Sequence, residues 1–313
     1  QSSYQEQLSG QSYQSLIDIN LTQYQLDTGL RFERTIDGGR QTLIPRLLWQ
    51  YTPFTDQSLV PLLDTFETDI NAQSLFNANR FSGYDRIADQ DQATVGLTSQ
   101  WFDQDRQWLE LSIGQAFYNK APRVTFYNQP ISSYIDRSYS NLVTSMVFQP
   151  SQKLRIASYV GYDPTRNETE LSQLSINYEP SDDLQVNIGH RFRDRPQLDD
   201  QFAEQTDLSM VVALNDNWRF MGRWNYDLVE RQDLDAMAGI EYSSCCWTLR
   251  LSARRYLNVR LDSTGAILDQ QQNRYNDGLF FEFEFRGLGG GNQPGFRQRL
   301  NRSIWDNLNG HSF

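Results

Sequence analysis

Five short polar turns divide much of the chain into runs of about ten residues in which apolar and polar side chains alternate. The turns are Asp103–Arg106, Pro150–Lys153, Pro180–Asp183, Asn215–Asn217 and Ser243–Cys245. After every second run the chain enters a longer polar segment, at 120–136, 165–168, 194–205 and 258–276. Tight turns therefore lie at one end of a sheet and long loops at the other, an arrangement typical of outer-membrane barrels.

The alternation predicts strands, because successive side chains of a strand point to opposite faces. In the last run, Leu279, Phe281, Phe283 and Phe285 oppose Phe280, Glu282, Glu284 and Arg286. We expect strands at 29–36, 41–51, 93–102, 107–119, 139–148, 154–162, 169–178, 184–193, 207–214, 218–227, 234–242, 247–256 and 278–286, with a fourteenth candidate at 15–21. A soluble β-sandwich also alternates, but it commonly has short turns at both ends. The pattern therefore favours an all-β, antiparallel transmembrane β-barrel.

Composition is consistent with a barrel wall. Mean hydropathy is -0.64, and no stretch approaches the ~18 consecutive apolar residues of a membrane helix, which excludes a helical membrane protein. The 16 Tyr and 7 Trp can form aromatic girdles at the two membrane interfaces. Five aromatic residues lie beside the short turns, where one girdle is expected: Trp101, Tyr178, Trp218, Tyr242 and Trp247. Filling of a soluble core is the alternative role for these rings.

The charged residues argue against a nucleic-acid surface, since the net charge is -11. Many arginines fall at the polar positions of the expected strands: Arg155, Arg191, Arg219, Arg223, Arg250, Arg254 and Arg286. Such arginines either pair with carboxylates across a barrel lumen or attract anions, and both readings stay open. Residues 1–14 lack the pattern of a secretory signal, so we expect a targeting segment that was removed or lies upstream.

No constellation of residues points to catalysis, a cofactor or a metal. The chain contains neither a Gly-x-Ser-x-Gly elbow nor a phosphate-binding glycine loop. His190 falls at an apolar position near a strand end, and His190 and His311 form no ligand spacing with the cysteines. Cys245 and Cys246 are adjacent, and neighbouring cysteines rarely bond each other because the geometry is poor. We expect a protein that is not an enzyme.

Six segments, in this order and spacing, resemble the LptD family of outer-membrane lipopolysaccharide assembly proteins. They are Leu43–Arg46, Pro53–Ser58, Phe81–Ile87 followed by Asp91 and Gln92, Ile113–Gln115 followed by Phe117 and Tyr118, Tyr242–Trp247, and Phe283–Gly289. The third segment contains the candidate loop motif Gly83, Asp85 and Arg86. The resemblance covers residues 43–289 and so extends over most of the chain.

The resemblance implies a barrel of about twenty-six strands, near the top of the bacterial range, preceded by a periplasmic jellyroll. This chain would then be the C-terminal half of the barrel, without the jellyroll or the first strands. Residues 1–288 would form the wall, with a long extracellular loop at 55–90, and 289–313 a periplasmic tail. Alone, such a half would expose two unpaired sheet edges to lipid, which is not tolerated.

The resemblance also implies a function, delivery of lipopolysaccharide to the outer leaflet of a Gram-negative outer membrane. The glycolipid would arrive from the bridge protein LptA, cross the lumen and leave by a lateral gate beside the last strand. The implied gate residues are Leu279, Phe281, Glu282, Phe283, Glu284, Phe285 and Arg286. Cys245 and Cys246 would form disulfides to N-terminal cysteines outside this chain. A diffusion porin and a soluble carbohydrate-binding β-protein are the alternatives.

Further partners follow from the same resemblance. The lipoprotein LptE would plug the lumen, with Tyr159, Arg191 and Arg223 as candidate contacts, and the BAM machinery would insert the barrel. Asp85 and Arg86 would pair to hold the long loop over the opening, or would contact sugar.

Overall fold

The computed structural model describes residues 20–58, 60, 65–66, 68, 74–83, 85–125, 138–195, 201–258 and 274–285. Apart from one turn of 3-10 helix, η1 (Ser74–Phe76), the described elements are strands. The strands are β1 (Tyr24–Gly29), β2 (Phe32–Ile36), β3 (Gly39–Thr52), β4 (Gln90–Asp103), β5 (Arg106–Tyr118), β6 (Leu142–Ser151), β7 (Leu154–Asp163), β8 (Glu168–Ser181), β9 (Leu184–Arg195), β10 (Gln201–Ala213), β11 (Trp218–Asp227), β12 (Gln232–Ser243), β13 (Trp247–Asn258) and β14 (Arg274–Phe285).

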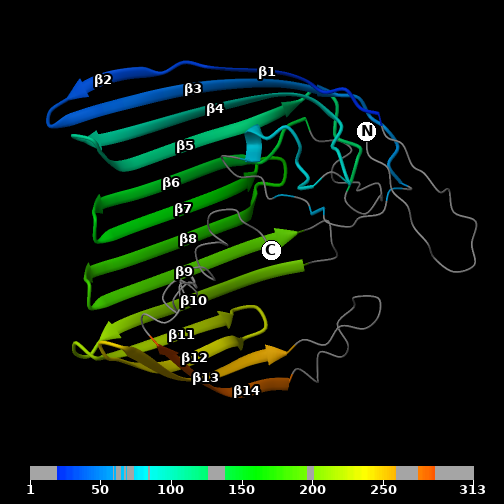
Figure 1. The fold of residues 1–313 in the computed structure, drawn as a ribbon. Helices are drawn as coiled ribbons and strands as arrows, with labels where there is room; N and C mark the ends of the chain where they lie inside the picture. The colour runs from blue at the N-terminus through cyan, green and yellow to red at the C-terminus, as the bar shows by residue number, and fades with distance from the viewer. Residues whose placement is uncertain are drawn as a thin grey trace, which may run out of the picture. The chain divides into compact units, whose positions relative to one another are not determined.

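They form a 14-stranded sheet in the order β1-β3-β4 and onward to β14, with β2 also paired to β3 (Figure 1). Every strand pair whose register is known is antiparallel. The all-β antiparallel fold class is therefore confirmed. The described residues divide into two compact units, within Gln1–Phe148, Ser158–Ser172 and Asp194–Gln201, and within Gln149–Ala157, Gln173–Arg193 and Phe202–Phe313.

All thirteen strands expected between 29 and 286 are present, most of them longer than predicted. The expected polar segments 194–205 and 258–276 were wrong in extent, because β10 begins at Gln201 and β14 at Arg274. The candidate strand at 15–21 is wrong at residues 20 and 21, which are not in a strand, and its other residues lie outside the described part. Strand β1 was not predicted.

Strands β1 and β2 form one line with a break at residues 30 and 31. Tyr24 pairs with Tyr51 and Phe32 with Leu43, so both strands keep the same register on β3. The break lies opposite Pro45, which has no N–H to donate to a neighbouring strand. The contact that remains there is the Leu30 N–H to the Pro45 carbonyl, at 3.1 Å. A proline in β3 thus explains why the pairing along β3 is interrupted between β1 and β2.

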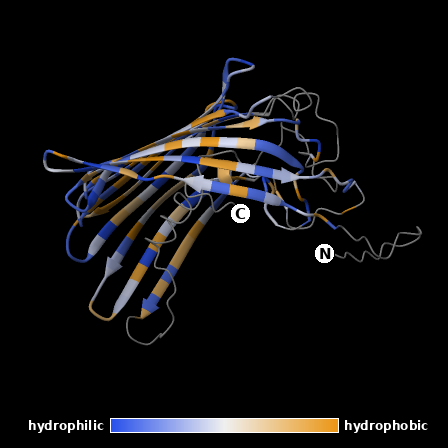
Figure 2. Cartoon of the chain, turned by 90° about the horizontal axis from the view of Figure 1, so that it is seen from above, coloured by the Kyte–Doolittle hydropathy of each residue, from blue (hydrophilic) through white to orange (hydrophobic). Residues whose placement is uncertain are grey.

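In the first unit, the exposed face of the sheet is apolar and the buried residues are largely polar. On β3 and β4, the exposed large side chains include Leu43, Leu47, Trp49, Val95 and Leu97. The opposite face carries buried Thr42, Gln50, Thr52 and Thr94, together with Leu48. This inverts the pattern of a soluble protein, and the alternation is visible as bands along the strands (Figure 2). We call the two sides the apolar face and the polar face.

The segment between β3 and β4 packs on the polar face of the first unit. At Gly96 of β4 an added Cβ would lie 2.6 Å from the Phe76 ring, and at Gly114 of β5 it would lie 2.8 Å from Leu75. The side chain of Gln50 donates to the Asn77 carbonyl at 2.9 Å. Two glycines on neighbouring strands therefore create the space in which η1 sits.

Polar contacts also stabilise the segment between β3 and β4 at residues that precede and follow η1. The Gln57 side chain donates to the Ile87 carbonyl at 2.7 Å and accepts from the Ile87 N–H at 3.0 Å. Phe81, Ala88 and Val124 form a buried apolar cluster. The segment after β5 thus packs against the one between β3 and β4.

The second unit repeats the separation of faces, and its register aligns side chains in rows across the strands. On the apolar face, Gly222, Ala238, Ala253 and Leu279 form one row over β11 to β14. The next row toward the long loops contains Trp224, Ala236, Arg255 and Asp277. Among the described residues we find no helix with the length and hydropathy that a helical membrane span requires.

The glycine seat of η1 gives a first prediction. In the full-length protein, Gly96→Val should displace Phe76, because overpacking costs about 1 to 3 kcal/mol. Trypsin should then cut the segment at Arg86, whose side chain is buried at 1% exposure, about tenfold faster than in the parent protein. Gly222→Val is the matched control, since its added Cβ meets Phe220 at an ordinary 3.5 Å. Unchanged resistance to trypsin in Gly96→Val would show that Gly96 does not create the space for η1.

Candidate functional site

The last described strand presents a strongly apolar surface on one side. β14 pairs with β13 along twelve positions, from Trp247 opposite Phe285 to Asn258 opposite Arg274. Four side chains on its apolar face are highly exposed, Leu279 at 79%, Phe281 at 71%, Phe283 at 47% and Phe285 at 58%. Glu282 and Glu284 lie on the polar face. Arg286, expected with them, lies outside the described residues.

An aromatic belt runs along the short-turn end of the second unit. Trp218 contacts Tyr242 with ring centroids 4.8 Å apart, and Tyr242 contacts Trp247 at 5.1 Å. Trp247 stacks on Phe283 at 5.7 Å, and Phe283 meets Phe285 edge-on. Tryptophan and tyrosine at strand ends are typical of the membrane interface of a barrel. Three of the five residues expected in this girdle therefore lie in the belt, namely Trp218, Tyr242 and Trp247.

Arg250 joins three carboxylates on the polar face near the same end. Its Nε donates to Glu241 of β12 at 2.6 Å, and its Nη1 donates to Glu282 and Glu284 of β14 at 3.0 and 3.1 Å. Arg219 of β11 reaches Glu241 at 3.4 Å. The Glu241 side chain is 8% exposed and that of Arg250 13%. We call these five residues the Arg250 cluster, which links four consecutive strands.

Other arginines of the polar face are also paired. Arg254 lies 2.7 Å from Asp235, and Arg223 lies 3.7 Å from the same carboxylate. The polar-face arginines of β11 and β13 are thus held by acidic partners. This favours the structural reading of these arginines over the attraction of free anions.

The turn between β12 and β13 carries the two cysteines. Both are exposed and neither is in a disulfide, and their sulfur atoms lie 2.6 Å apart. The hydrogen bond with Cys245 raises the pKa of the Cys246 thiol above its ordinary value. The turn therefore offers two accessible thiols, and the pairing expected from the resemblance stays a prediction.

The loop motif lies in the packed segment between β3 and β4. Asp85 is 6% exposed and Arg86 1%, and the Arg86 guanidinium donates to the Gln57 carbonyl at 3.2 Å. Gly83 has φ +72°, a conformation that favours glycine. Burial supports a structural role for this motif, while the expected pairing of Asp85 with Arg86 stays a prediction.

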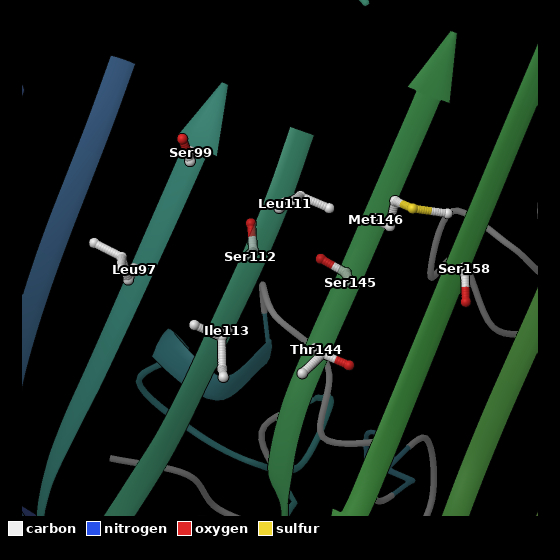
Figure 3. A pocket seen from close by; sticks show the side chains of 9 residues that line it. All are labelled: Leu97, Ser99, Leu111, Ser112, Ile113, Thr144, Ser145, Met146 and Ser158. Atoms are coloured by element: carbon white, nitrogen blue, oxygen red, sulfur yellow. The ribbon is translucent and has the colours of Figure 1, made fainter. Parts of the chain in front are cut away.

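Each unit contains one groove, and most of the residues that line each groove occupy apolar-face positions. The first has a volume of about 370 Å³ and is lined by Leu97, Ser99, Leu111, Ser112, Ile113, Thr144, Ser145, Met146 and Ser158 (Figure 3). The second, of about 720 Å³, is lined by Arg223, Ala236, Met237, Ala238, Ala253, Arg254, Arg255, Asp277, Gly278 and Leu279. The second groove has charged residues in its lining and the first has none.

The outward pair Arg255 and Asp277 was missed by sequence reasoning. Arg255 Nε donates to Asp277 at 2.7 Å and Nη2 at 3.1 Å. Both residues occupy apolar-face positions, since Ala253 opposes Leu279 two residues away on the same strands. The signal was available in the sequence as an arginine at an apolar position, but its partner required the register.

No described feature resembles a catalytic or metal centre. His190 Nε2 lies 3.6 Å from Glu204, and both side chains are more than a third exposed. In the part of the chain that the structure describes, no group of His, Cys, Asp and Glu is arranged to hold a metal ion.

The family profile and the curated relatives indicate one family. The family profile described as "LptD: LPS transport system D" matches residues 1–218. "LPS-assembly protein LptD" of Pseudomonas putida (strain W619) is 32% identical over 318 residues, covering 89% of this chain and 33% of that protein. The protein of the same description from Alkalilimnicola ehrlichii is 34% identical, covering 85% and 34%. That from Pseudomonas aeruginosa (strain UCBPP-PA14) is 31% identical, covering 94% and 36%.

Two solved structures align with most of this chain at low TM-scores. The FpvAI–pyocin S2 complex gives a TM-score of 0.32 at 11% identity, covering 84% of this chain and 40% of that chain. A mutant of Rh. blastica porin gives 0.31 at 10% identity, covering 86% and 90%.

An antiparallel sheet with an apolar exposed face, a polar opposite face and an aromatic belt defines an outer-membrane β-barrel protein. Within that class, the chain belongs to the LptD family. It spans about a third of the length of the curated relatives it matches. The family is described by transport and assembly, so the expectation that the chain is not an enzyme is confirmed.

The Arg250 cluster gives a prediction about stability. In the full-length protein, Arg250→Met should leave Glu241 poorly paired and destabilise the barrel by about 3 to 5 kcal/mol, as for other broken buried pairs. Replacing both residues, Arg250→Met with Glu241→Met, should restore much of that loss.

The unfolding temperature, read from gel mobility after heating, measures both changes. Arg255→Gln is the matched control, because its ion pair is exposed on both sides and is expected to contribute less than about 1 kcal/mol. Equal losses in Arg250→Met and Arg255→Gln would contradict the importance of the cluster.

The cysteine turn gives a prediction about pH. Since Cys245 raises the pKa of Cys246, Cys245→Ala should lower that pKa and increase the thiolate fraction of Cys246 at any pH below it. In the reduced full-length protein, alkylation of Cys246 by iodoacetamide at pH 8 should become faster than in the parent. The pH–rate curve should shift to lower pH, and an unshifted curve would exclude the proposed coupling.

Proposed function

We propose that this chain forms part of the wall and one side of the exit of a barrel that delivers lipopolysaccharide to the outer leaflet of the outer membrane. The observation that carries the proposal is β14, with a row of exposed apolar side chains on one face and glutamates on the other. Membership of the LptD family supports the choice of substrate, since its relatives are described as LPS-assembly proteins.

Closure of the barrel requires further strands. In the described sheet, β1 and β2 at one end and β14 at the other each pair on one side. Unpaired backbone groups are not tolerated in lipid. We infer that the remaining two thirds of the whole protein supplies strands that close a barrel of about twenty-six, together with a periplasmic jellyroll that meets LptA.

The exit follows from the same edge. The far edge of β14 would meet the first strand of the barrel, and parting of these strands would open a path into the membrane. The acyl chains would pass along Leu279, Phe281 and Phe283, while the sugar stayed on the side of Glu282, Glu284 and Arg286. An amphiphile needs such a two-sided path, because burying its polar part in hydrocarbon is costly.

The remaining parts take supporting roles in this proposal. Cys245 and Cys246 would bond to cysteines of the N-terminal region and tie it to the wall. LptE would occupy the lumen near Tyr159, Arg191 and Arg223, and the BAM machinery would insert the barrel. Asp85 and Arg86, both buried, would hold the segment between β3 and β4 in place rather than contact sugar.

A cross-link between Phe281→Cys and a cysteine on the first barrel strand of the full-length protein tests the exit. It should abolish the appearance of new lipopolysaccharide at the cell surface, and a reductant should restore it. As a matched control, a cross-link between Leu251→Cys and Phe281→Cys joins strands that already pair and should have no effect. Normal delivery with the first cross-link complete would refute the exit. A general diffusion porin would be unaffected by either cross-link.

A further inference from the structure

We propose that the second groove of the apolar face is a binding site for a phosphorylated, acylated glycolipid, with one acyl chain in the groove and a phosphate at Arg255. The inference rests on the proposed function, and it adds a site on the outside of the wall beside the exit. The ligand proposed for this site is the glycolipid that the barrel is proposed to deliver.

Six of the ten residues that line the groove occupy apolar-face positions, which lie on the membrane side of the sheet. Its lining alternates along each strand, and the apolar-face members form one patch: Ala236 and Ala238 on β12, Ala253 and Arg255 on β13, and Asp277 and Leu279 on β14. The other four lining residues form one row of polar-face positions, so they contribute backbone on this side of the sheet: Arg223, Met237, Arg254 and Gly278. The floor is therefore methyl groups and backbone, and one end reaches Leu279 on the last strand.

An outward ion pair at this position needs an explanation. A charged side chain facing hydrocarbon costs about 2 to 4 kcal/mol at the bilayer centre and little near the interface. Arg255 and Asp277 are 56% and 63% exposed. Arg255 lies over the Tyr275 ring at 5.5 Å, and Trp224 in the same row contacts Tyr226 at 5.3 Å. These aromatic rings place the pair at the level of the lipid head groups.

The chemistry of Arg255 suits a phosphate. In the described contacts, the bidentate pair with Asp277 engages Nε and Nη2, and a guanidinium has five N–H donors. A fork of donors matches phosphate geometry. Asp277 would orient the guanidinium in the empty groove and compete with the phosphate for it.

The groove also lies next to the proposed exit. An acyl chain that leaves at the edge of β14 first meets Leu279, the most exposed of the large apolar side chains on the described strands. From there the row of Ala253 and Ala238 leads away from the edge at the same level of the wall. A chain lying there would place its head group beside Arg255, one row nearer the long loops.

The test uses the full-length protein with its lumen lipoprotein in phosphatidylcholine nanodiscs containing one lipid A per hundred lipids. A photo-cross-linking residue replaces Ala253, and in a matched protein it replaces Thr144, which lines the first groove without charged neighbours. Lipid A should be captured at position 253 about tenfold above its share of the lipids, and at position 144 in proportion to its share. Equal capture at both positions would overturn the proposal.

Three substitutions, each combined with the photo-cross-linking residue at position 253, separate the contributions of Arg255, Asp277 and the groove itself. Arg255→Gln should lower capture about tenfold, as expected for one lost charge-assisted hydrogen bond, whereas Asp277→Asn should raise it. Ala238→Leu should lower capture by filling the groove, and added apolar volume facing lipid does not disturb the barrel. Lipid A without phosphates should be captured like phosphatidylcholine. Capture that is insensitive to both Arg255→Gln and loss of phosphate would refute the phosphate contact.

The proposed function is tested separately by the cross-link between Phe281→Cys and the first strand. If that cross-link blocks delivery while capture at position 253 equals that at 144, the exit stands and the groove proposal fails. If capture is enriched but the cross-link has no effect, the site exists and the proposed exit is wrong.

Discussion

Hydrogen bonding between neighbouring strands is the constraint on which the rest of this molecule depends. In a bilayer each unpaired N–H or C=O costs several kcal/mol, so a membrane-spanning sheet must pair every strand on both sides. Pairing fixes the register, and the register decides which side chains become neighbours. The rows on the apolar face, the aromatic belt and the Arg250 cluster all exist because particular residues of β11 to β14 are opposed.

The break between β1 and β2 shows how strictly this constraint acts. One proline in β3 removes a single donor, and the strand beside it divides at the facing residues although the register continues. A proline is tolerated at a strand edge or an interruption but not within a ladder. The position of Pro45 therefore sets where the pairing beside β3 is interrupted, without altering which face the side chains of β1 and β2 occupy.

Much of the wall could be predicted from the sequence, because a period of two is unaffected by what each strand pairs with. Leu279, Phe281, Phe283 and Phe285 are apolar-face residues in any register. Features that join different strands could not be predicted. The seat of η1 depends on Gly96 and Gly114 being opposite each other, and Arg250 meets Glu282 only because they are cross-strand partners. The start of β10 could not be predicted either, because its polar residues, such as Gln201 and Glu204, are typical of a loop.

The two sides of the wall differ in how they tolerate charge, and this separates the roles of neighbouring arginines. Arg254 and Arg255 are adjacent, so they point to opposite faces. Arg254 meets Asp235 on the polar face, where acidic partners and water are at hand. Arg255 faces the membrane, where its partner Asp277 satisfies only part of the guanidinium. A charged pair on a surface that favours apolar side chains lowers the stability of the barrel. Binding of a lipid head group to Arg255 would offset part of that loss.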